Sequence, residues 1–421
     1  MTSAALVWIA LVAGAIGTGA SFVGILVAKR SMEGLYAGVG LLLFVVCAWG
    51  FGGVALAYDR LDAILYAFVF GLAGIAGGFA LVSTLLSLLS RRRRQTSIPS
   101  SEGLPEDPGT PAVLVLGEVE PPTYSPTATA AALEDLTEEG LLKASIGVLP
   151  FLFMAQKTRY RAAGGTSPAA RQLEAIAERL ESVLGGPKTG RVDSAWCEGE
   201  HSLASRVAET VARGFHTIVV AEAVIAESLE VDVAKREVDA LRLSDLGVSV
   251  TYARPLWRSE RIAGLVANRV MTVAGDPPVT GVVLVGQGQP EDRSRDRREF
   301  DEQETAFLNH VRMLLIERGL QDQSVRIAWA DWRSPEITGT VRHLAALGCQ
   351  RIVVSPACFA LDSITTLLDL QLAVRQARVD ETVSVVTLPA WHDDPGLVEE
   401  LRADISIALN AAAMARPPLQ P

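Results

Sequence analysis

Three long stretches near the start of the chain contain apolar and small residues and no charged side chain. They cover residues 4–28, 34–58 and 63–90. Each is longer than the roughly 20 residues that a helix needs to cross the hydrocarbon core of a bilayer. A cleaved signal peptide is the competing interpretation of the first stretch, but its length, the missing basic leader and the two further stretches oppose it. We therefore predict three transmembrane helices.

Beyond residue 110 the hydrophobic pattern changes to short apolar runs separated by amphipathic stretches such as 169–184 and 302–318. Continuous apolar runs of this length are typical of strands that are covered on both faces. Strands that alternate with helices predict an α/β fold with parallel sheets and right-handed crossovers. The predicted strands are 112–116, 192–196, 217–221, 248–252, 281–285, 325–329, 351–355 and 383–387.

The second half of this α/β part nearly repeats the first. Residues 195–220 resemble 328–354, and Val113–Gly117 matches Val282–Gly286. A duplicated β/α unit predicts two Rossmann-like lobes that face one another, with any chemistry in a cleft between them. The expected organisation is a membrane domain (1–94), a linker (95–110), lobe 1 (111–275), lobe 2 (278–410) and a disordered tail (411–421).

Charges beside the apolar stretches predict the orientation of the chain in the cell membrane. Lys29 and Arg30 follow the first stretch and Arg91–Arg94 follow the third, so both basic clusters can lie on the cytoplasmic side. This places the N-terminus outside and the α/β part in the cytoplasm. The spans contain no ionisable residue, which favours an anchor or assembly module over an ion pathway.

The net charges of the two parts of the chain indicate which kinds of partner each part favours. Residues 1–94 hold 7 Lys+Arg and 3 Asp+Glu, a net +4, so the remaining 31 basic and 45 acidic residues give −14. A nucleic acid is therefore an unfavourable partner of the α/β part. The bilayer itself is an expected partner. The glycine pairs Gly34-x3-Gly38 and Gly74-x3-Gly78 allow close helix packing, either within the trio or in a homo-oligomer or complex with another membrane protein.

The sequence gives only weak indications of a common cofactor. Gly286-Gln-Gly288 lacks the third glycine and the acidic partner of a dinucleotide site. The four cysteines are scattered, which makes a disulfide framework or a thiolate zinc site improbable.

Several segments, in the same order along the chain, resemble the ferrochelatases, a family of tetrapyrrole metal chelatases. The resemblance covers nearly all of residues 111–410 and not the membrane stretches. The related cobalt chelatases are the nearest alternative. The matching segments are the opening strand and turn Val113–Gly117, the run Tyr160-Arg-Ala-Ala-Gly164-Gly165-Thr-Ser167-Pro168, the turn Val285-Gly-Gln287-Gly288-Gln-Pro290, the run Pro356-Ala-Cys-Phe359-Ala-Leu-Asp362-Ser-Ile-Thr365-Thr366-Leu367, and Asp394-Pro395.

The resemblance implies a porphyrin bound between the lobes and a divalent metal, usually Fe²⁺, inserted into it. Insertion needs a base for the two pyrrole protons and a path of carboxylates and imidazole for the metal. In the family a His and a Glu are the central pair, and here their positions hold Gln287 and Thr365. Neither side chain takes a proton near neutral pH.

Other residues at matching positions are candidates for the remaining roles. Those expected to contact a porphyrin or haem ligand are Gly117, Glu118, Tyr160, Ser167, Pro168, Gly288 and Phe359. Asp362 and Asp369 are candidate metal ligands, since Asp369 lies one helical turn beyond Thr365. Alternatively, Asp362 caps a helix, Asp369 and Glu118 are surface charges, and His392 is held by loop hydrogen bonds.

Three hypotheses remain open. The first is a membrane-anchored ferrochelatase homologue that has lost metal insertion and keeps the ligand site for binding or scaffolding. The second is a working chelatase that uses other groups, such as Glu118, Asp369 or His392. The third is a membrane assembly protein whose α/β part is an interaction surface.

Overall fold

The computed structural model describes residues 2–57, 61–90, 108–138, 140, 142–143, 145, 147–184, 190–199, 201–289 and 298–415. Most of the predicted linker 95–110, the cluster Arg91–Arg94 and the last part of the predicted tail lie outside these residues. The chain divides into two compact units, residues 1–94 with 123–165 and residues 95–122 with 166–421. Each unit is described by itself.

The first unit contains the three predicted apolar helices. They are α1 (Thr2–Val27), α2 (Arg30–Ala57) and α3 (Leu61–Ser90), and all three are long and apolar enough to cross a membrane. Glycines let two of them approach α1 closely. A Cβ on Gly78 would lie 1.9 Å from the Ile16 carbonyl oxygen, and one on Gly50 would lie 2.5 Å from the Leu11 nitrogen. The pair Gly74-x3-Gly78 thus packs within the trio, whereas a Cβ on Gly34 or Gly38 would meet nothing within 4 Å.

Two further helices belong to the same unit. They are α4 (Pro126–Glu138) and α5 (Leu149–Ala162), and they contact α3 and α1 respectively. Phe153 of α5 is buried in one cluster with Val23, Leu26 and Val27 of α1. In sequence this segment lies within the predicted lobe 1 (111–275), and in the structure Phe153 packs against α1.

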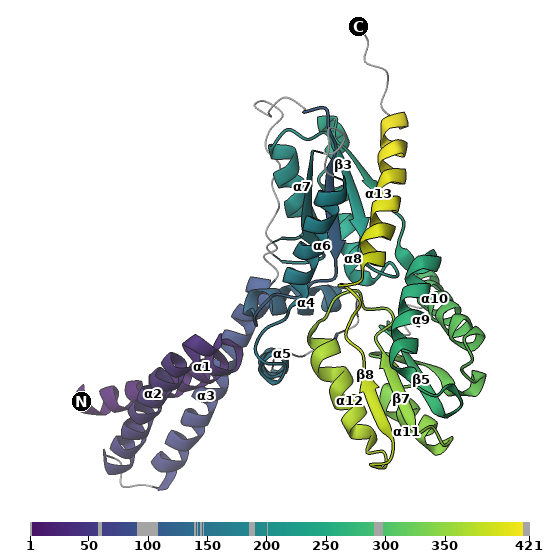
Figure 1. The fold of residues 1–421 in the computed structure, drawn as a ribbon. Helices are drawn as coiled ribbons and strands as arrows, with labels where there is room; N and C mark the ends of the chain where they lie inside the picture. Colours follow the sequence, from purple (N-terminus) through teal and green to yellow (C-terminus); the bar gives the residue numbers. More distant parts are fainter. Residues whose placement is uncertain are drawn as a thin grey trace. The chain divides into compact units, whose positions relative to one another are not determined.

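The second unit contains two four-stranded parallel sheets with strand orders β2-β1-β3-β4 and β6-β5-β7-β8 (Figure 1). The strands are β1 (Ala112–Gly117), β2 (Arg191–Trp196), β3 (Thr217–Glu222), β4 (Ser249–Tyr252), β5 (Thr280–Gly286), β6 (Val325–Trp329), β7 (Arg351–Ser355) and β8 (Ser384–Thr387). All eight predicted strands are present. The register repeats as well, because Gly117 pairs with Trp196 in the first sheet and Gly286 with Trp329 in the second. The α/β fold with two similar halves is confirmed.

Helices cover both faces of each sheet. They are α6 (Ala169–Leu184), α7 (Leu203–Ala212), α8 (Leu229–Ala240), α9 (Glu260–Ala274), α10 (Arg298–Glu317), α11 (Ile337–Ala346), α12 (Leu370–Ala377) and α13 (Pro395–Ala415). Along β1, Val113 and Val115 enter one core, while Leu114 and Leu116 enter another with α7 and α8. Alternate side chains of a strand point to opposite faces, which explains why these strands are apolar throughout.

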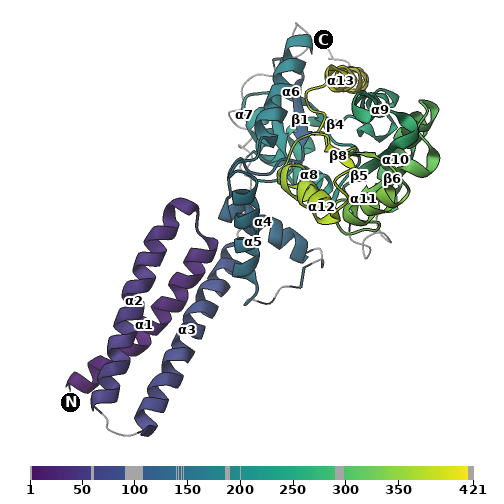
Figure 2. The same cartoon turned by 60° about the horizontal axis from the view of Figure 1, so that its bottom comes forward.

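The two halves exchange their last helices. Helix α9 follows the first sheet in sequence but contacts β7 of the second, and α13 follows the second sheet but contacts β3 of the first. The yellow α13 runs beside α6 in Figure 1, and the rotated view in Figure 2 shows it beside both α6 and α9. Val113 of β1 and Val282 of β5 accordingly belong to a single hydrophobic core. One hydrophobic core is therefore shared by the two sheets.

Candidate functional site

The topology of both sheets points to the same place for a ligand. In each sheet the strand order reverses once, between β1 and β3 and between β5 and β7. In open α/β sheets, ligands bind outside the carboxyl ends of the strands at this reversal point. Glu118 directly follows β1 and Gln287 directly follows β5, so both reversal points carry a predicted site residue.

Glu118 and Gln287 are in direct contact. The side-chain amide of Gln287 donates a hydrogen bond to Oε2 of Glu118 at 2.5 Å. Burial raises the pKa of Glu118 to about 7, and the neighbouring Glu230 carboxylate adds to the rise, while donors from Ser228 and Gln287 partly offset it. The structure therefore joins the two halves through a carboxyl group that changes charge near neutral pH.

The backbone of the Gln287–Gly288 turn is held by another carboxylate, Glu304 of α10. Its Oε1 accepts the backbone N–H of Gln287 at 2.8 Å, and its Oε2 accepts that of Gly288 at 3.1 Å. Burial raises the pKa of Glu304, and the two backbone donors and the Cys358 thiol oppose the rise. Gly288 has φ +84°, and a Cβ there would lie 2.3 Å from the Asp331 carbonyl oxygen. The turn therefore requires glycine at this position.

Sequence reasoning did not select Glu304. A buried glutamate in an amphipathic helix gives no signal of its own, since its partners are backbone groups 16 and 17 residues away.

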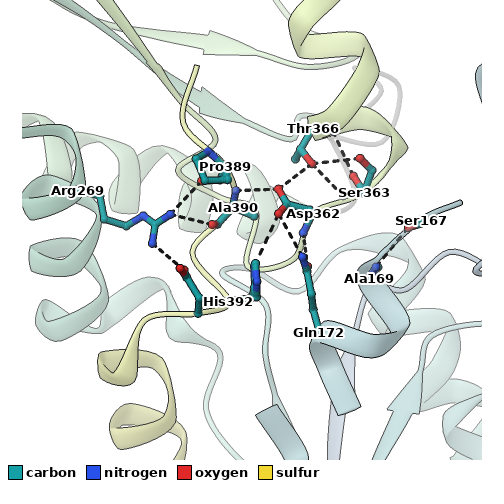
Figure 3. Close-up of polar contacts among 11 residues, drawn as sticks. Ser167, Ala169, Gln172, Arg269, Asp362, Ser363, Thr366, Pro389, Ala390 and His392 are labelled. Carbon is teal, nitrogen blue, oxygen red and sulfur yellow. Dashed lines mark hydrogen bonds and ion pairs between the residues drawn. The ribbon is translucent and has the colours of Figure 1, made fainter. Parts of the chain in front are cut away.

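Asp362 is at the centre of a second network, which ties lobe 2 to α6 (Figure 3). Its carboxylate accepts hydrogen bonds from the Ala390 N–H at 2.9 Å, the Gln172 side-chain amide at 3.2 Å and the Thr366 hydroxyl at 3.3 Å. The Asp362 N–H in turn donates to Oε1 of Gln172 at 2.7 Å. A carboxylate with this many donors has a structural role in the fold, and its candidate role as a metal ligand remains a prediction.

His392 lies at the edge of the same network. Its Nδ1 is 3.8 Å from Oδ2 of Asp362, and burial lowers its pKa. Arg269 fixes the surrounding loop by donating to Oδ1 of Asp393 at 2.8 Å and to the Ala390 carbonyl at 3.0 Å (Figure 3). These hydrogen bonds belong to Arg269, whereas Nδ1 of His392 is buried without a hydrogen-bond partner, so loop hydrogen bonding by His392 itself remains a prediction.

The other central residue, Thr365, begins a π-helical turn, Thr365–Asp369. The wider hydrogen-bonding pattern of a π turn changes the face relation that an α-helical i, i+4 spacing would give Thr365 and Asp369. Just before it, the Ile364 N–H donates to Glu120 at 2.5 Å. π-Helical turns inside helices occur frequently at functional sites.

Several segments of the resemblance thus lie together within the second unit, whereas residues 160–165 belong to the first. A Cβ on Gly117 would lie 3.3 Å from a methyl carbon of Leu361, so the run 361–366 lies against the turn after β1. Ser167 accepts the Ala169 N–H at 3.3 Å at the start of α6. Pro168, which lies between Ser167 and Ala169 in the sequence, is partly exposed.

Two predicted contact residues lie elsewhere. Phe359 is 8% exposed and belongs to the core on the α11 side of the second sheet. Tyr160 is part of α5 in the first unit, where its ring centroid is 6.3 Å from that of Tyr124. Neither position tests a ligand role, and both roles remain predictions.

The donor atoms of the site define its chemistry. Within the described parts of the chain, no group of three or more His, Cys, Asp or Glu side chains is arranged to hold a metal ion. Glu118, Glu304 and Asp362 are each bound to donors from the protein. The arrangement places two buried carboxyl groups with raised pKa values, Glu118 and Glu304, beside the neutral amide of Gln287.

Comparison with solved structures finds similar folds at low sequence identity. SirB from Bacillus subtilis with Fe³⁺ is 13% identical with a TM-score of 0.47, over 73% of this chain and 98% of that chain. The sirohydrochlorin chelatase SirB from B. subtilis subspecies spizizenii, in complex with cobalt, is 13% identical with a TM-score of 0.44, over 73% of this chain and 98% of that one. CbiX, the terminal enzyme for biosynthesis of siroheme in denitrifying bacteria, is 14% identical with a TM-score of 0.43, over 70% and 99%.

No family model and no curated protein matches the chain. The three structures are members of the tetrapyrrole metal chelatase superfamily, and their names do not specify ferrochelatase. At this identity and these TM-scores the similarity is one of fold only.

Proposed function

We propose that this protein is a membrane-anchored tetrapyrrole-binding protein of the chelatase type that binds a porphyrin or haem without inserting a metal. The observation that supports this most is the Gln287–Glu118 hydrogen bond at the reversal points of both sheets. The sequence segments that resemble ferrochelatases supply the turns and strand ends around it, while the position of the family's imidazole holds an amide.

The chemistry of the substituted positions supports binding without insertion. Metal insertion must remove two protons from the macrocycle, and neither the Gln287 amide nor the Thr365 hydroxyl accepts a proton near neutral pH. The neighbouring carboxylate Asp362 is engaged with three protein donors. A flat ligand can still be bound by such a site through apolar contact and a few polar groups.

A titration of the full-length protein in detergent micelles tests this proposal. Protoporphyrin, coproporphyrin and haem are added separately, and the shift of the Soret band is followed. We expect saturable binding at micromolar ligand that Gln287→Trp weakens strongly, because the larger side chain fills the place between the strand ends. Gln376→Trp, at an exposed position on α12, is the matched control. No saturable binding of any of the three ligands would refute the proposal.

One observation favours a second function, an active chelatase that inserts Fe²⁺ as substrate. A carboxyl group with a pKa of about 7, such as Glu118, is suited to accept a proton at neutral pH. An anaerobic insertion assay decides between the two functions. Turnover in the parent protein that is lost in Glu118→Gln would establish the second function, and no turnover in the parent would exclude it.

The third hypothesis, a membrane assembly protein, also remains a proposal. On α2, Gly34 and Gly38 face space in which a Cβ would meet nothing within 4 Å. Light scattering of the full-length protein in detergent gives its oligomeric state. A monomer that co-purifies with no other protein would count against an assembly role.

A further inference from the structure

Helix α5 has an apolar first half and a charged second half. No charged residue occurs between Gly147 and Gln156, whereas Lys157, Arg159 and Arg161 follow. The buried residues of α5 are Pro150, Phe153, Lys157 and Tyr160. Apolar side chains favour the hydrocarbon layer and basic ones the headgroup level, so this division suits a helix that runs across the boundary of a bilayer.

The charged half of α5 binds the end of α1. Nζ of Lys157 donates to the carbonyl oxygens of Ile25 at 2.5 Å and Ala28 at 3.4 Å, and lies 3.1 Å from the Glu33 carboxylate. The last carbonyls of a helix lack partners within the helix and attract a positive charge. The first apolar span ends at Val27, so Lys157 marks the level at which α1 leaves the apolar layer.

The apolar half of α5 reaches further along the membrane-type helices. The ring of Phe151 lies 6.2 Å from the ring of Phe79 on α3, which lies 6.3 Å from that of Phe22 on α1. Phe79 precedes Leu86, the end of the third span, by seven residues, which is about 10 Å of helix. Phe22 precedes Val27 by five residues, or about 7 Å.

Helix α5 itself gives a consistent depth. Phe151 precedes Lys157 by six residues, which is about 9 Å along the helix axis. Three helices therefore agree that Phe151 lies roughly 7–10 Å below the level of the first polar side chains.

The outer face of this half is exposed and apolar. Val148 is 47% exposed, Phe151 44% and Met154 37%, and they follow one another at intervals of three residues. We infer that the outer face of α5, formed by Phe151 and Met154 together with Val148 just before the helix, is a fourth membrane-contacting surface that inserts among the lipid acyl chains beside α1 and α3. The inference rests on the three spans being in the membrane and is independent of tetrapyrrole binding.

Lipid acyl chains are the partner that fits this surface. It is continuous with the exposed apolar sides of α1 and α3, and Phe22 and Phe79 are themselves in ring contact beside it. Exposed apolar groups at this depth stabilise the protein only if they leave water. A consequence is that Tyr160, at the end of α5, is held just outside the apolar layer, next to the fixed Lys157.

Nitroxide labels on the full-length protein in lipid nanodiscs test the inference. The four native cysteines are buried, and the labelled parent protein provides the background signal. Labels are placed at Phe151→Cys and, as a second variant, Met154→Cys. Thr158→Cys, exposed on the same helix beyond Lys157, is the control for the polar side, and Leu72→Cys, 53% exposed in the middle of α3, is the control for the apolar layer.

For each nitroxide label, the collision rate with oxygen is compared with the collision rate with a water-soluble nickel complex. We expect labels at Phe151 and Met154 to favour oxygen, as the label at Leu72 does, and the label at Thr158 to favour nickel. Nickel access at Phe151 and Met154 equal to that at Thr158, with Leu72 still protected, would overturn the inference alone. Nickel access at Leu72 would show that α3 does not cross the membrane, and the inference about α5 would then fail as well.

Discussion

The side-chain amide of Gln287 donates to the carboxylate of Glu118, the residue that occupies the equivalent place in the other half of the duplication. In both halves this residue directly follows the glycine that ends the first strand of the sheet. The bond therefore lies where the two similar halves meet and joins their strand ends. One partner is permanently neutral, and the other changes charge near pH 7.

The raised pKa of Glu118 predicts a pH-dependent stability. The folded protein holds the proton up to about pH 7, whereas the unfolded chain releases it near the ordinary value of 4.5. The folded state therefore binds more protons between these values, so this group lowers stability as pH rises through them. We expect Glu118→Gln to raise the melting temperature at pH 8, by the equivalent of roughly 1–3 kcal/mol, and the gain to shrink towards pH 5.

Thermal unfolding of both proteins across this pH range checks the prediction. Glu381→Gln, at an exposed loop position, is the control and should leave the melting temperature unchanged. A gain from Glu118→Gln that is equal at pH 5 and pH 8 would show that the pKa of Glu118 is not raised.

The hydrogen bonds of Asp362 predict that replacing this residue destabilises the fold, independently of any metal binding. Asp362→Ala removes an acceptor from the Ala390 N–H, the Gln172 amide and the Thr366 hydroxyl in a site that is only 6% exposed. Because buried donors are then left unpaired, we expect a loss of about 2–5 kcal/mol in the free energy of unfolding. Denaturant titration of the full-length protein measures it, and a change below the scatter of the control Glu381→Gln would contradict the structural role.

The backbone conformation of Gly288 predicts that a side chain at this position destabilises the turn. With φ at +84° and the Asp331 carbonyl 2.3 Å from a would-be Cβ, Gly288→Ala should destabilise the protein by at least about 1–3 kcal/mol. Gly339→Ala is the matched control, since it lies inside α11 with nothing within 4 Å, and alanine favours helices. Chemical denaturation of the two variants should therefore shift in opposite directions. Equal shifts would mean that the turn adapts to a side chain.

The repeats and apolar runs were sufficient to predict the eight strands, because strands buried on both faces have a distinct composition. The exchange of α9 and α13 between the halves could not be predicted, since helix–sheet packing across halves has no local signal. The place of α5 beside α1 was also missed, because Lys157 binds backbone carbonyls rather than a recognisable side-chain partner.

The site was predictable in part. Glu118 and Gln287 could be paired from the duplication, and the structure brings them together. The raised pKa of Glu118 depends on burial and on Glu230 and Glu304, which are distant in sequence. The Asp362 network likewise depends on Gln172 and Ala390, 190 and 28 residues away, and no spacing in the sequence indicates them.

Restoring the family's pair of residues predicts a gain of function. Gln287→His with Thr365→Glu supplies an imidazole and a carboxylate at the two positions that the resemblance identifies. If the surrounding turns bind a porphyrin, we expect the double variant to insert Fe²⁺ under anaerobic conditions at a rate that the parent does not show. Absence of turnover in a double variant that still binds porphyrin would indicate that more than two groups are missing.

The most direct test of porphyrin binding without metal insertion follows one sample under anaerobic conditions. Full-length protein in detergent is saturated with protoporphyrin, Fe²⁺ is added, and the absorbance spectrum is recorded over time. We expect a shifted Soret band on binding and a metal-free porphyrin spectrum that then persists. Conversion to the haem spectrum faster than in a protein-free control, or no spectral shift on mixing, would contradict it.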